Sequence, residues 1–552
     1  MKKRLLVIGG VAVGATAAGR ARRMSEEIEI TLLERGPFIS YANCGLPYFI
    51  SGDIKDRKEL FLETPEGFER RYRVKVLVNT EAVEIDRGAR RVRVKTSAGE
   101  AWLPYDRLVL AQGGNPVMPS VPGAAAPHVF NLWTVPDMDR LHGYIERERP
   151  RTAVIVGGGF IGLEMAEALR KRGLEVSVVE LLPTVMATMD REFGARISGE
   201  LEAHGVRVIT GTGVAAVQAA DKAVVLSDGR CIPADVVLFS VGVRPDLALA
   251  KNAGLETGPA GGLLVDDHLC TTDPAIYAAG DMIEVIHKIS GRKARIPLAG
   301  PANRQGRIAA SNALGAGMTY SGALGTSVVK VFEATAAMAG LSERVAREAG
   351  FRVGVAIVHR DHHAGYYPGA KDLSLKLVYD RETARLLGAQ AFGRAGVDKR
   401  IDVLATALHG KMTLHDLAEL DLAYAPPYSS ANDAVNVAAF VGLNDISGFS
   451  PLVTAAELKD ALGSSESPLV LDVRAQEDFE RSHVQGATHI PLEELRLRCE
   501  ALPRDRRIFV HCRSGHRSHL ATRILRERGF RQVANVTGGF VSIVSEGGFQ
   551  LS

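Results

Sequence analysis

One arrangement of residues constrains this chain more than any other: an apolar segment, a glycine-rich turn, a helix-forming segment and a second apolar segment that ends in glutamate. Near the N-terminus, the mostly apolar segment 4–8 runs into a turn at residues 9–14, and Glu34 follows a second segment at residues 29–33 that contains Ile30, Leu32 and Leu33. Glycines let such a turn close and approach a pyrophosphate at a helix N-terminus, while the terminal carboxylate accepts hydrogen bonds from a ribose. The pattern therefore predicts a parallel βαβ unit that binds a dinucleotide.

The same arrangement occurs again further along the chain. Residues 153–156 precede Gly157, Gly159 and Gly162 in full G-x-G-x-x-G spacing, and Glu180 ends the next apolar segment. A single glycine-rich turn could lack any function, but two such turns with their acids predict two bound dinucleotides. We expect one to be a flavin and the other a nicotinamide. The carboxylate of Glu180 favours NADH over NADPH because it repels a 2′-phosphate.

Composition and length describe an ordinary globular protein of three or four domains, at about 100 to 200 residues each. The 552 residues are 46% apolar and 24% charged, and a net charge of +3 does not indicate a nucleic acid or a membrane as partner. Five scattered cysteines fit a reducing cytoplasm. The basic and apolar N-terminus imitates a secretory signal, but that alternative does not require an acid at position 34. No apolar run reaches about 18 residues, so we expect no membrane span.

Two further apolar segments end in residues suited to a bound flavin. Residues 108–114 form a predicted strand that ends in small residues, and residues 272–281 form one that ends in Asp281. With these motifs in this order, the chain resembles the two-dinucleotide-binding flavoprotein disulfide reductases. In that family the aspartate binds the ribityl and pyrophosphate region of the flavin. The resemblance covers about residues 1–446.

The resemblance implies an FAD-binding domain at residues 1–117 and 246–330, an NAD(H)-binding domain at 118–245 and a dimerisation domain at 331–446. It also implies that the following residues bind the two cofactors: Gly9, Gly14, Glu34, Arg35, Ala111, Gly113, Asp281, Ala299, Gly157, Gly159, Phe160, Gly162, Glu180 and Gly242. Phe160 resembles an aromatic lid over the flavin, although packing alone would also explain it. Gln112 and Trp133 depart from the Thr and Arg that relatives usually carry.

Cys44 lies ten residues after Glu34, in a segment that by the resemblance opens a helix beneath the flavin. A helix dipole would favour a thiolate there, and the alternative is a buried, inert cysteine. Dithiol relatives carry a second cysteine nearby, whereas the next cysteine here is Cys231. We therefore expect oxidised Cys44 to be a sulfenic acid or a mixed disulfide with a small thiol.

Two features favour the mixed disulfide. In the peroxide- and oxygen-reducing relatives, the first glycine turn has the pattern G-x-x-H, and this chain has Ala12 in place of the histidine. This difference counts against a peroxidase or an NADH oxidase. Coenzyme A disulfide reductases instead have S-x-x-N-C before the helix and basic residues on the first helix that meet CoA phosphates. The matching residues are Ser40, Asn43 and Cys44, with Arg20, Arg22 and Arg23 on the helix. A solvated helix face is the alternative for the arginines, of which Arg23 is the first candidate.

That branch also places tyrosines of a second subunit beside the sulfur, and Tyr367 and Tyr424 match those positions. Ordinary packing is the alternative, because a buried phenol needs a hydrogen-bond partner in any case. If the match holds, the catalytic unit is a homodimer. His359, His362 and His363 lack cysteines or carboxylates at ligand spacing, so we expect no metal there.

Residues 447–453 have the composition of a linker, and residues 454–552 predict a separate α/β domain. In it, Cys512 follows an apolar segment, and four residues separate it from Arg517 at the start of a helix. The N–H groups of such a loop, with the arginine, stabilise a thiolate and hold a transferred anion. Phosphatases have C-x5-R, whereas this C-x4-R resembles a rhodanese. The resemblance implies a persulfide on Cys512, with a scaffold role as the alternative.

The whole chain resembles fused coenzyme A disulfide reductase–rhodanese proteins. The implied α/β fold has two Rossmann-like domains, an α+β dimerisation domain and a rhodanese domain. The implied reaction uses NADH and FAD to reduce CoA persulfide, small-thiol persulfides or polysulfide at Cys44, releasing sulfide and thiol, while Cys512 carries sulfane sulfur. Coenzyme A could also stay bound as a cofactor. Two alternatives remain: a CoA-disulfide reductase with an accessory rhodanese, and a slow flavin redox sensor.

Overall fold

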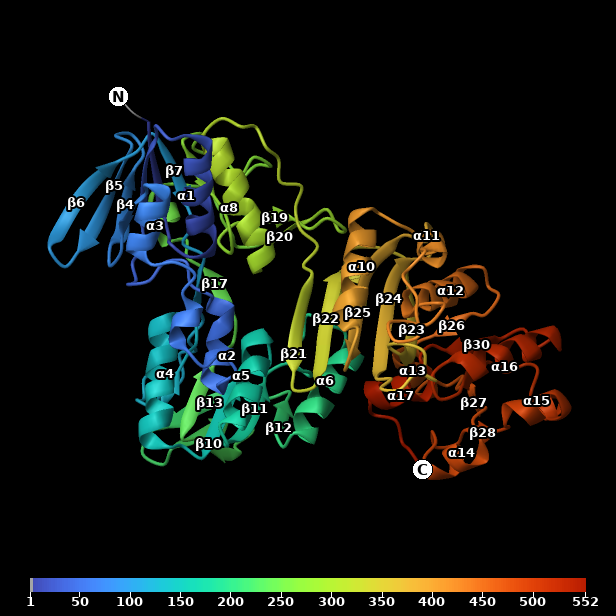
Figure 1. Ribbon diagram of the computed structural model, residues 1–552. Helices are drawn as coiled ribbons and strands as arrows, with labels where there is room; N and C mark the ends of the chain where they lie inside the picture. Colours follow the sequence, from blue (N-terminus) through green and yellow to red (C-terminus); the bar gives the residue numbers. More distant parts are fainter. Residues whose placement is uncertain (1–2) are drawn as a thin grey trace. The chain divides into compact units, whose positions relative to one another are not determined.

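The computed structural model describes residues 3–552, so the first two residues of the predicted FAD-binding segment lie outside it. The chain forms two compact units (Figure 1). The first contains the residues up to Pro183 together with Gly205–Gly325, and the second contains Thr184–His204 and Thr326–Ser552. One stretch of the predicted NAD(H)-binding segment thus belongs to the second unit. The domain boundaries themselves stay a prediction.

The first unit contains a five-stranded parallel sheet in the order β18-β7-β1-β2-β3. Its strands are β1 (Arg4–Ile8), β2 (Glu29–Leu33), β3 (Lys75–Leu77), β7 (Arg107–Leu110) and β18 (Ile276–Ala278). Strands of a parallel sheet are buried on both faces and therefore almost wholly apolar, as in β1. Two helices pack against each other beside this sheet, α1 (Ala12–Met24) and α8 (Ala299–Ala313).

A second parallel sheet in the same unit has the order β12-β11-β10-β16-β9. Its strands are β9 (Val129–Phe130), β10 (Thr152–Val156), β11 (Glu175–Glu180), β12 (Arg207–Thr210) and β16 (Val236–Phe239). As the glycine turn predicts, α5 (Phe160–Lys171) connects β10 to β11. α4 (Val135–Glu148) begins at a capping box formed by Thr134 and Asp137.

Smaller elements of the first unit surround these two sheets. Its antiparallel strands include β4 (Glu81–Asp86), β5 (Arg91–Thr96), β6 (Gly99–Pro104), β8 (Gly114–Pro116), β13 (Val214–Gln218), β14 (Ala223–Leu226), β15 (Cys231–Pro233) and β17 (Val243–Pro245). Its short helices are α2 (Leu46–Ser51), α3 (Pro65–Tyr72) and α7 (Ala248–Asn252). Of these helices, α2 packs against α5, the helix that connects β10 to β11.

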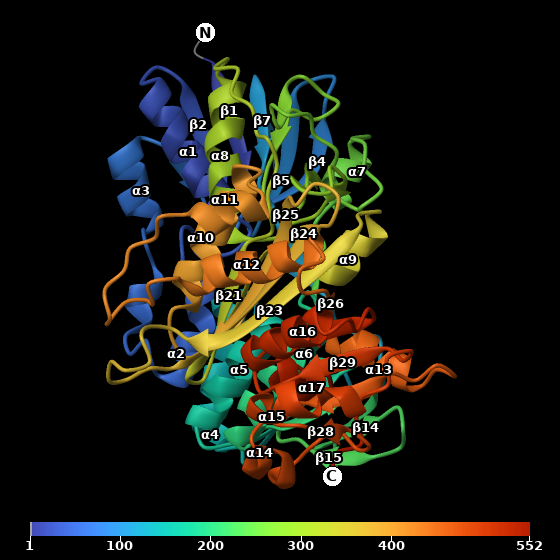
Figure 2. The same cartoon turned by 90° about the vertical axis from the view of Figure 1, so that its right-hand side faces the viewer.

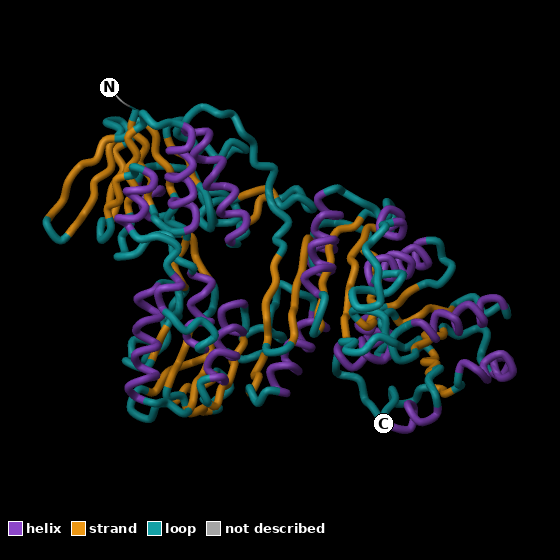
Figure 3. Tube along the Cα trace, in the orientation of Figure 1, coloured by secondary structure: helices purple, strands orange, loops and turns teal. Residues whose placement is uncertain are grey.

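The second unit contains an antiparallel sheet in the order β21-β22-β25-β24-β23, and Figure 3 draws its strands in orange. Its strands are β21 (Ser327–Val331), β22 (Ala334–Gly340), β23 (Val353–Asp361), β24 (Asp372–Asp380) and β25 (Leu386–Gly393). The helices are α6 (Arg191–Ala203), α9 (Glu343–Glu348), α10 (Val397–His409), α11 (Leu414–Glu419) and α12 (Ala434–Ile446). α10 packs on β22 and β25, and α12 packs on β23 and β24.

A buried lysine ties α6 to this sheet. Lys376 on β24 is 1% exposed, and its Nζ lies 2.9 Å from carboxylate oxygens of both Asp190 and Glu343 and 2.5 Å from that of Glu192. Burial opposes the charged form, but the three carboxylates raise the pKa of Lys376 well above its ordinary value. A buried charge is tolerated only when it is paired in this way.

The C-terminal part of the second unit, drawn in orange-red to red in Figure 2, contains a five-stranded parallel sheet in the order β26-β30-β29-β27-β28. Its strands are β26 (Leu452–Val453), β27 (Leu469–Asp472), β28 (Thr488–His489), β29 (Ile508–His511) and β30 (Val533–Val536). Its helices are α13 (Ala455–Leu462), α14 (Gln476–Arg481), α15 (Leu492–Arg498), α16 (His516–Glu527) and α17 (Gly539–Glu546). Within residues 3–552, no helix is both long enough and apolar enough to cross a membrane.

Candidate active site

The first glycine turn brings β1, β7 and α1 close together. Gly9 has a φ of +102°, and a Cβ there would lie 2.3 Å from the carbonyl oxygen of Ala111. A Cβ on Gly14 would lie 1.7 Å from the carbonyl oxygen of Gly9. Both positions therefore require glycine for the packing of the backbone itself. Val11, in the place of a middle glycine, directly precedes the first residue of α1.

Two backbone hydrogen bonds hold Glu34 over this turn. Its Oε2 accepts from the N–H of Gly10 at 2.8 Å, and its Oε1 accepts from the N–H of Gly36 at 2.7 Å. The parallel pairing of β1 with β2 sets Leu33 beside Ile8, which brings Glu34 to the turn as the spacing predicts. Each carboxylate oxygen has a second lone pair, so both can still accept hydrogen bonds from ribose hydroxyls.

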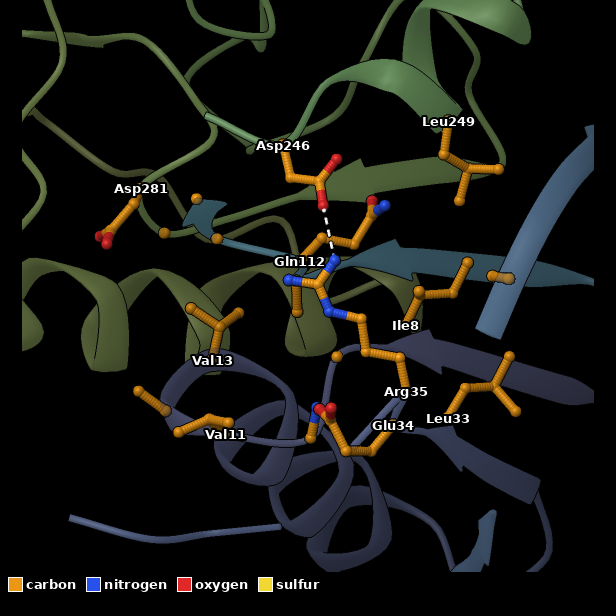
Figure 4. A pocket seen from close by; sticks show the side chains of 18 of the residues that line it. Ile8, Val11, Val13, Leu33, Glu34, Arg35, Gln112, Asp246, Leu249 and Asp281 are labelled. Carbon is orange, nitrogen blue, oxygen red and sulfur yellow. Dashed lines mark hydrogen bonds and ion pairs between the residues drawn. The ribbon is translucent and has the colours of Figure 1, made fainter. Parts of the chain in front are cut away.

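A cavity of about 370 Å³ opens at the carboxyl ends of these strands (Figure 4). Its size is that of a small-molecule or cofactor site. The predicted site residues that line it are Gly9, Glu34, Arg35, Asn43, Ala111, Gly113 and Asp281. Tyr41, Gln112 and Trp133 also line it, without a role predicted from the sequence. Gln112 Oε1 is buried without a hydrogen-bond partner among residues 3–552, which fits a ligand that donates a hydrogen bond there.

Two charged residues reach this cavity from different strand ends. Arg35 follows β2, and its Nη1 lies 3.2 Å from Asp246 Oδ2 while its Nη2 donates to Asn115 Oδ1 at 2.8 Å (Figure 4). Asp281 follows β18, and burial raises its pKa. A carboxylate that has lost water in this way gains stability when a ligand donates hydrogen bonds to it. Ala299 begins α8, and Ala302 of the same helix lines the cavity.

The arginines near the end of α1 have three different environments. Arg22 is buried and donates to three backbone carbonyl groups. Arg20 donates through Nε to Ser311 Oγ at 2.9 Å, and Arg23 is exposed. Arg22 is thus committed to the fold, whereas Arg20 and Arg23 stay candidates for binding CoA phosphates.

The second glycine turn repeats the geometry of the first. Gly157 has a φ of +105°, and a Cβ there would lie 2.6 Å from the carbonyl oxygen of Ser240. A Cβ on Gly162 would lie 2.0 Å from the carbonyl oxygen of Gly157, but one on Gly159 would meet no atom within 4 Å. The middle glycine therefore leaves open space at the N-terminus of α5, where a pyrophosphate would lie.

Glu180, the acid that accompanies the second glycine turn, is held in the same way as Glu34. Glu180 Oε2 accepts from the N–H of Gly158 at 2.7 Å, and its Oε1 accepts from the N–H of Leu182 at 2.8 Å. Phe160 is the first residue of α5 and is half-buried. Gly242, with a φ of +106°, lies between β16 and β17.

The segment before Cys44 is anchored to the first glycine turn. The N–H of Ser40 donates to the carbonyl oxygen of Gly10 at 2.9 Å, and Ser40 has the left-handed φ of +45° that costs energy for a residue other than glycine. Cys44 lies in the short 3₁₀ turn Asn43–Gly45, next to Asn43, which lines the cavity. Of Ser40, Asn43 and Cys44, only Asn43 lines the cavity, and the other two lie close to it in the same segment.

The structure does not place Cys44 inside the helix whose dipole was expected to favour its thiolate. Cys44 precedes the six-residue helix α2 instead of forming its first turn. Although the residue is exposed, the protein around the sulfur withdraws water from it, and the carboxylates of Glu164 and Asp281 add negative charge nearby. These effects, in that order, raise the pKa of the Cys44 thiol.

Glu164 is a candidate residue that the sequence did not reveal. It lies one helical turn after Phe160 on α5, and Tyr48 Oη of α2 donates to its Oε1 at 3.2 Å. Burial raises the pKa of Glu164 to about 6, against the opposing effect of the Tyr48 hydrogen bond. The packing of α2 on α5 brings this carboxyl group into the surroundings of Cys44, and no local pattern signals that packing.

The predicted tyrosines lie in the second unit. Tyr424 is 48% exposed, and its hydroxyl lies 3.2 Å from that of Tyr366, while Tyr367 is 42% exposed and packs edge-on against His363 at 5.5 Å. The hydrogen-bonded pair is thus Tyr366 with Tyr424. The exposure of these phenols argues against the alternative of ordinary core packing.

The loop after β29 surrounds Cys512 with hydrogen-bond donors. Cys512 is 2% exposed, and its Sγ accepts from the N–H of Gly515 at 3.2 Å and from the hydroxyl of Ser518 at 3.4 Å. Gly515 has a φ of +105° and caps α16. Arg517 is the second residue of α16, and its Nη2 lies 3.8 Å from Asp478 Oδ2. One backbone N–H and one hydroxyl therefore point at the sulfur, and the role of Arg517 stays a prediction.

A buried ion pair supports this loop from β27. Arg474 Nη2 lies 2.6 Å from Asp472 Oδ2, and the side chains are 5% and 0% exposed. His511, directly before Cys512, lies 3.7 Å from the same carboxylate oxygen. Burial lowers the pKa of His511 to about 4, so this ring is neutral at physiological pH.

Comparison with known proteins agrees with this architecture. Residues 3–306 match the family model for pyridine nucleotide-disulphide oxidoreductases, residues 326–435 match the model for the dimerisation domain of that family, and residues 454–546 match the model for rhodanese-like domains. The chain is 35% identical to the NAD(P)H sulfur oxidoreductase (CoA-dependent) of Pyrococcus abyssi over 443 residues. The alignment covers 80% of this chain and 98% of that protein.

Two solved structures are similar over nearly the whole chain. Reduced Bacillus anthracis CoADR-RHD aligns with a TM-score of 0.96 and 40% identity, covering 99% of this chain and 98% of that chain. The NAD-dependent persulfide reductase from A. fulgidus aligns with a TM-score of 0.91 and 38% identity, covering 98% and 99%. The chain belongs to the pyridine nucleotide-disulphide oxidoreductase family and carries a rhodanese-like domain after the dimerisation domain.

Proposed function

We propose that this enzyme uses NADH to reduce CoA persulfide, small-thiol persulfides or polysulfide, and that Cys512 carries sulfane sulfur for the same task. The observation that carries the proposal is the pairing of two different cysteine sites in one chain. Cys44 is an exposed thiol next to Asn43, which lines the cofactor-sized cavity, and Cys512 lies in a loop where the N–H of Gly515 donates to its sulfur. Relatives named as a CoA-dependent sulfur oxidoreductase and a persulfide reductase support the choice of substrate class.

The residues of the first unit fit FAD and NADH. The cavity residues listed above would hold FAD, with Glu34 at the ribose and Asp281 near the ribityl chain, and Gly157, Gly159 and Glu180 would hold NADH. Ser40, Asn43, Arg20 and Arg23 would bind CoA. When bound, the two dinucleotides supply a pair of electrons to sulfur at Cys44.

Cys44 acts as the nucleophile in this proposal. Attack on the inner sulfur of CoA persulfide forms a Cys44–CoA disulfide and expels hydrosulfide, whereas attack on the outer sulfur forms a Cys44 persulfide and releases CoA. Overall, one S–S bond is cleaved, NADH and a proton provide two electrons and two hydrogens, and the products are thiol, hydrogen sulfide and NAD⁺. Attack requires a thiolate, so bound ligands must offset the loss of water and the nearby carboxylates, which together raise the pKa of Cys44.

Glu164 would donate a proton in this reaction, and Tyr48 would hold Glu164 in position. A carboxyl group with a pKa of about 6 is partly protonated near neutral pH, and it can give a proton to a leaving thiolate or hydrosulfide. The hydroxyl of Tyr48 fixes the position of Glu164 Oε1.

The functional assembly in this proposal is a homodimer. The dimerisation domain supports a second copy, and the exposed Tyr367 and Tyr424 would then reach the sulfur of the other subunit. A cytoplasmic location stays a prediction from the cysteine content.

A second candidate function is reduction of CoA disulfide, because the chain is also 32% identical to the coenzyme A disulfide reductase of Staphylococcus haemolyticus. The deciding experiment measures anaerobic NADH oxidation with CoA persulfide and with CoA disulfide side by side, and counts released sulfide. We expect one sulfide per NADH and a larger kcat/KM with the persulfide. A larger kcat/KM with the disulfide would contradict the proposal and support the second candidate.

A further inference from the structure

The rhodanese-like domain covers the free edge of the antiparallel sheet. β23 is the edge strand of that sheet, and its Ile357 N–H donates to Thr537 Oγ1 at 2.8 Å. The Thr537 hydroxyl in turn donates to the carbonyl oxygen of Ile357 at 3.3 Å. Unpaired backbone groups of a buried edge are costly, and one threonine satisfies both of them. This contact fixes the residue directly before Gly538 and Gly539.

His359, two residues further along β23, joins the sheet to α17. Its Nδ1 lies 2.7 Å from Ser374 Oγ on β24, and its Nε2 lies 3.0 Å from Ser542 Oγ on α17. Loss of water around the ring, followed by the charge of Arg196, lowers the pKa of His359 to about 3. A neutral imidazole donates through one nitrogen and accepts through the other, so it can bond to both hydroxyls at once.

Gly538 and Gly539 lie between this contact and the cysteine loop, with φ of +72° and +60°. A Cβ on Gly538 would lie 2.0 Å from Ser542 Oγ and 2.9 Å from His359 Nε2. A Cβ on Gly539 would lie 2.5 Å from the carbonyl oxygen of Cys512. Because neither position has room for a side chain, a shift of α17 at His359 must move the backbone next to Cys512.

The first turn of α17 also holds the cysteine loop directly. The N–H of Phe540 donates to the carbonyl oxygen of Cys512 at 2.7 Å, and the N–H of Val541 donates to that of Arg513 at 3.1 Å. The N–H of Gly515, later in the same loop, points at the sulfur. A continuous series of contacts thus leads from β23 to the donors around Cys512.

We infer that His359 is a positioning residue for sulfur transfer at Cys512, acting through Ser542 and the first turn of α17. The inference rests on the sulfur-carrying role proposed for Cys512. With thiosulfate as donor, the Cys512 thiolate attacks the outer sulfur, the donor S–S bond breaks, and sulfite leaves with the electron pair. Cyanide then takes the outer sulfur of the Cys512 persulfide as thiocyanate and regenerates the thiolate, with no net oxidation. If these hydrogen-bond donors are displaced from the charged sulfur, the rate of sulfur transfer should fall more than the affinity for thiosulfate.

The test measures transfer from thiosulfate to cyanide by full-length variants. These are His359→Ala, His359→Gln, Ser542→Ala and the double variant of the two alanine substitutions. We expect His359→Ala to lower kcat about 10-fold while the KM for thiosulfate changes less than about twofold. Glutamine keeps a donor and an acceptor, so His359→Gln should recover much of the loss. The double variant should be no slower than the single variants, because both alanine substitutions remove the same contact between His359 and Ser542.

Arg360→Ala is the matched control, because Arg360 is the next residue on β23 and its side chain is exposed. A wild-type kcat in His359→Ala, additive losses in the double variant, or an equal loss in Arg360→Ala would overturn the inference. If His359→Ala does not fold, Ser542→Ala alone decides, since it removes only a hydroxyl group from the same contact. Failure of the proposed function looks different, because wild-type and Cys512→Ser would then transfer sulfur equally slowly.

Discussion

Cys44 and Cys512 are both candidate sulfur nucleophiles, but the chain surrounds them in opposite ways. Cys44 is exposed, precedes its helix, and has a pKa raised by loss of water and by the carboxylates of Glu164 and Asp281. Cys512 is buried and accepts an N–H from Gly515 and a hydroxyl hydrogen from Ser518. The sulfur of Cys44 is thus near negative charge, and the sulfur of Cys512 is near hydrogen-bond donors.

This contrast indicates which site a single chain completes by itself. The donors around Cys512 are fixed by a loop and a helix end, so they need no rearrangement when charge develops on the sulfur. The thiolate of Cys44 needs positive charge or donors from a bound dinucleotide, CoA or a second copy. The proposed sulfur-carrying site is thus preorganised, whereas the proposed reducing site depends on its ligands.

The strongest test of this contrast separates the two activities. Cys44→Ser should lower NADH-dependent persulfide reduction by on the order of 10³-fold or more, because the nucleophile is lost, and should leave thiosulfate-to-cyanide transfer unchanged. Cys512→Ser should do the reverse for sulfur transfer. Cys231→Ser is the control, since Cys231 is also an exposed free thiol. Full NADH-linked turnover in Cys44→Ser would refute the scheme.

Removal of the carboxylate beneath the Cys512 loop should damage only the preorganised site. Asp472→Ala leaves Arg474 buried and unpaired, which should destabilise the rhodanese-like domain by about 3–5 kcal/mol. Burial would raise the pKa of Asp472, but hydrogen bonds from Arg474 lower it overall. The stabilisation is therefore present at neutral pH and is lost as the pH falls below the ordinary range of an aspartate.

Amide hydrogen exchange followed by mass spectrometry checks this prediction. Peptides from residues 454–552 should exchange faster in Asp472→Ala, while peptides around Cys44 keep their wild-type rates. Faster exchange in both regions would show that the two sites do not have separate stabilities.

Glu164→Gln should change the reducing site in two ways. Loss of a carboxyl group with a pKa of about 6 should lower kcat/KM by about 10²-fold and remove the change in rate near pH 6. Because the negative charge of Glu164 raises the pKa of Cys44, its removal should lower that pKa and speed alkylation of Cys44 by iodoacetamide near neutral pH. Glu175→Gln, on the exposed start of β11, is the matched control. Unchanged alkylation would mean that Glu164 does not influence the thiol.

The smallest expected effect concerns the arginine of the Cys512 loop. Arg517 and Asp478 form a half-exposed ion pair at 3.8 Å, and such pairs contribute about 0.2–1 kcal/mol. Asp478→Asn should free Arg517 for an anionic donor and lower the KM for thiosulfate up to about fivefold, with kcat unchanged. Steady-state kinetics at low and high salt would show this difference fading as salt screens the pair. A higher KM would instead indicate that Asp478 orients Arg517 for binding.

The parts of the fold that local spacing controls were predictable from the sequence. β1 covers the residues predicted as a strand, and Glu34 and Glu180 lie over their glycine turns as expected, because parallel pairing fixes where a strand ends. Glu164 and Tyr48 were missed because they meet through the packing of α2 on α5, which no local pattern encodes. The effect of Glu164 and Asp281 on Cys44 was missed for the same reason, since both acids are distant from it in sequence.

The path of α6 has a consequence for how the protein is made. The helix is synthesised with the NAD(H)-binding segment, but it packs in the second unit, on a sheet that begins only at Ser327. On the ribosome it must wait for roughly 120 further residues, on the order of ten seconds at usual elongation rates. Its apolar residues Phe193, Ile197 and Leu201, which are buried in the finished fold, stay uncovered during that time. The nascent chain should therefore present a chaperone-binding segment well before release.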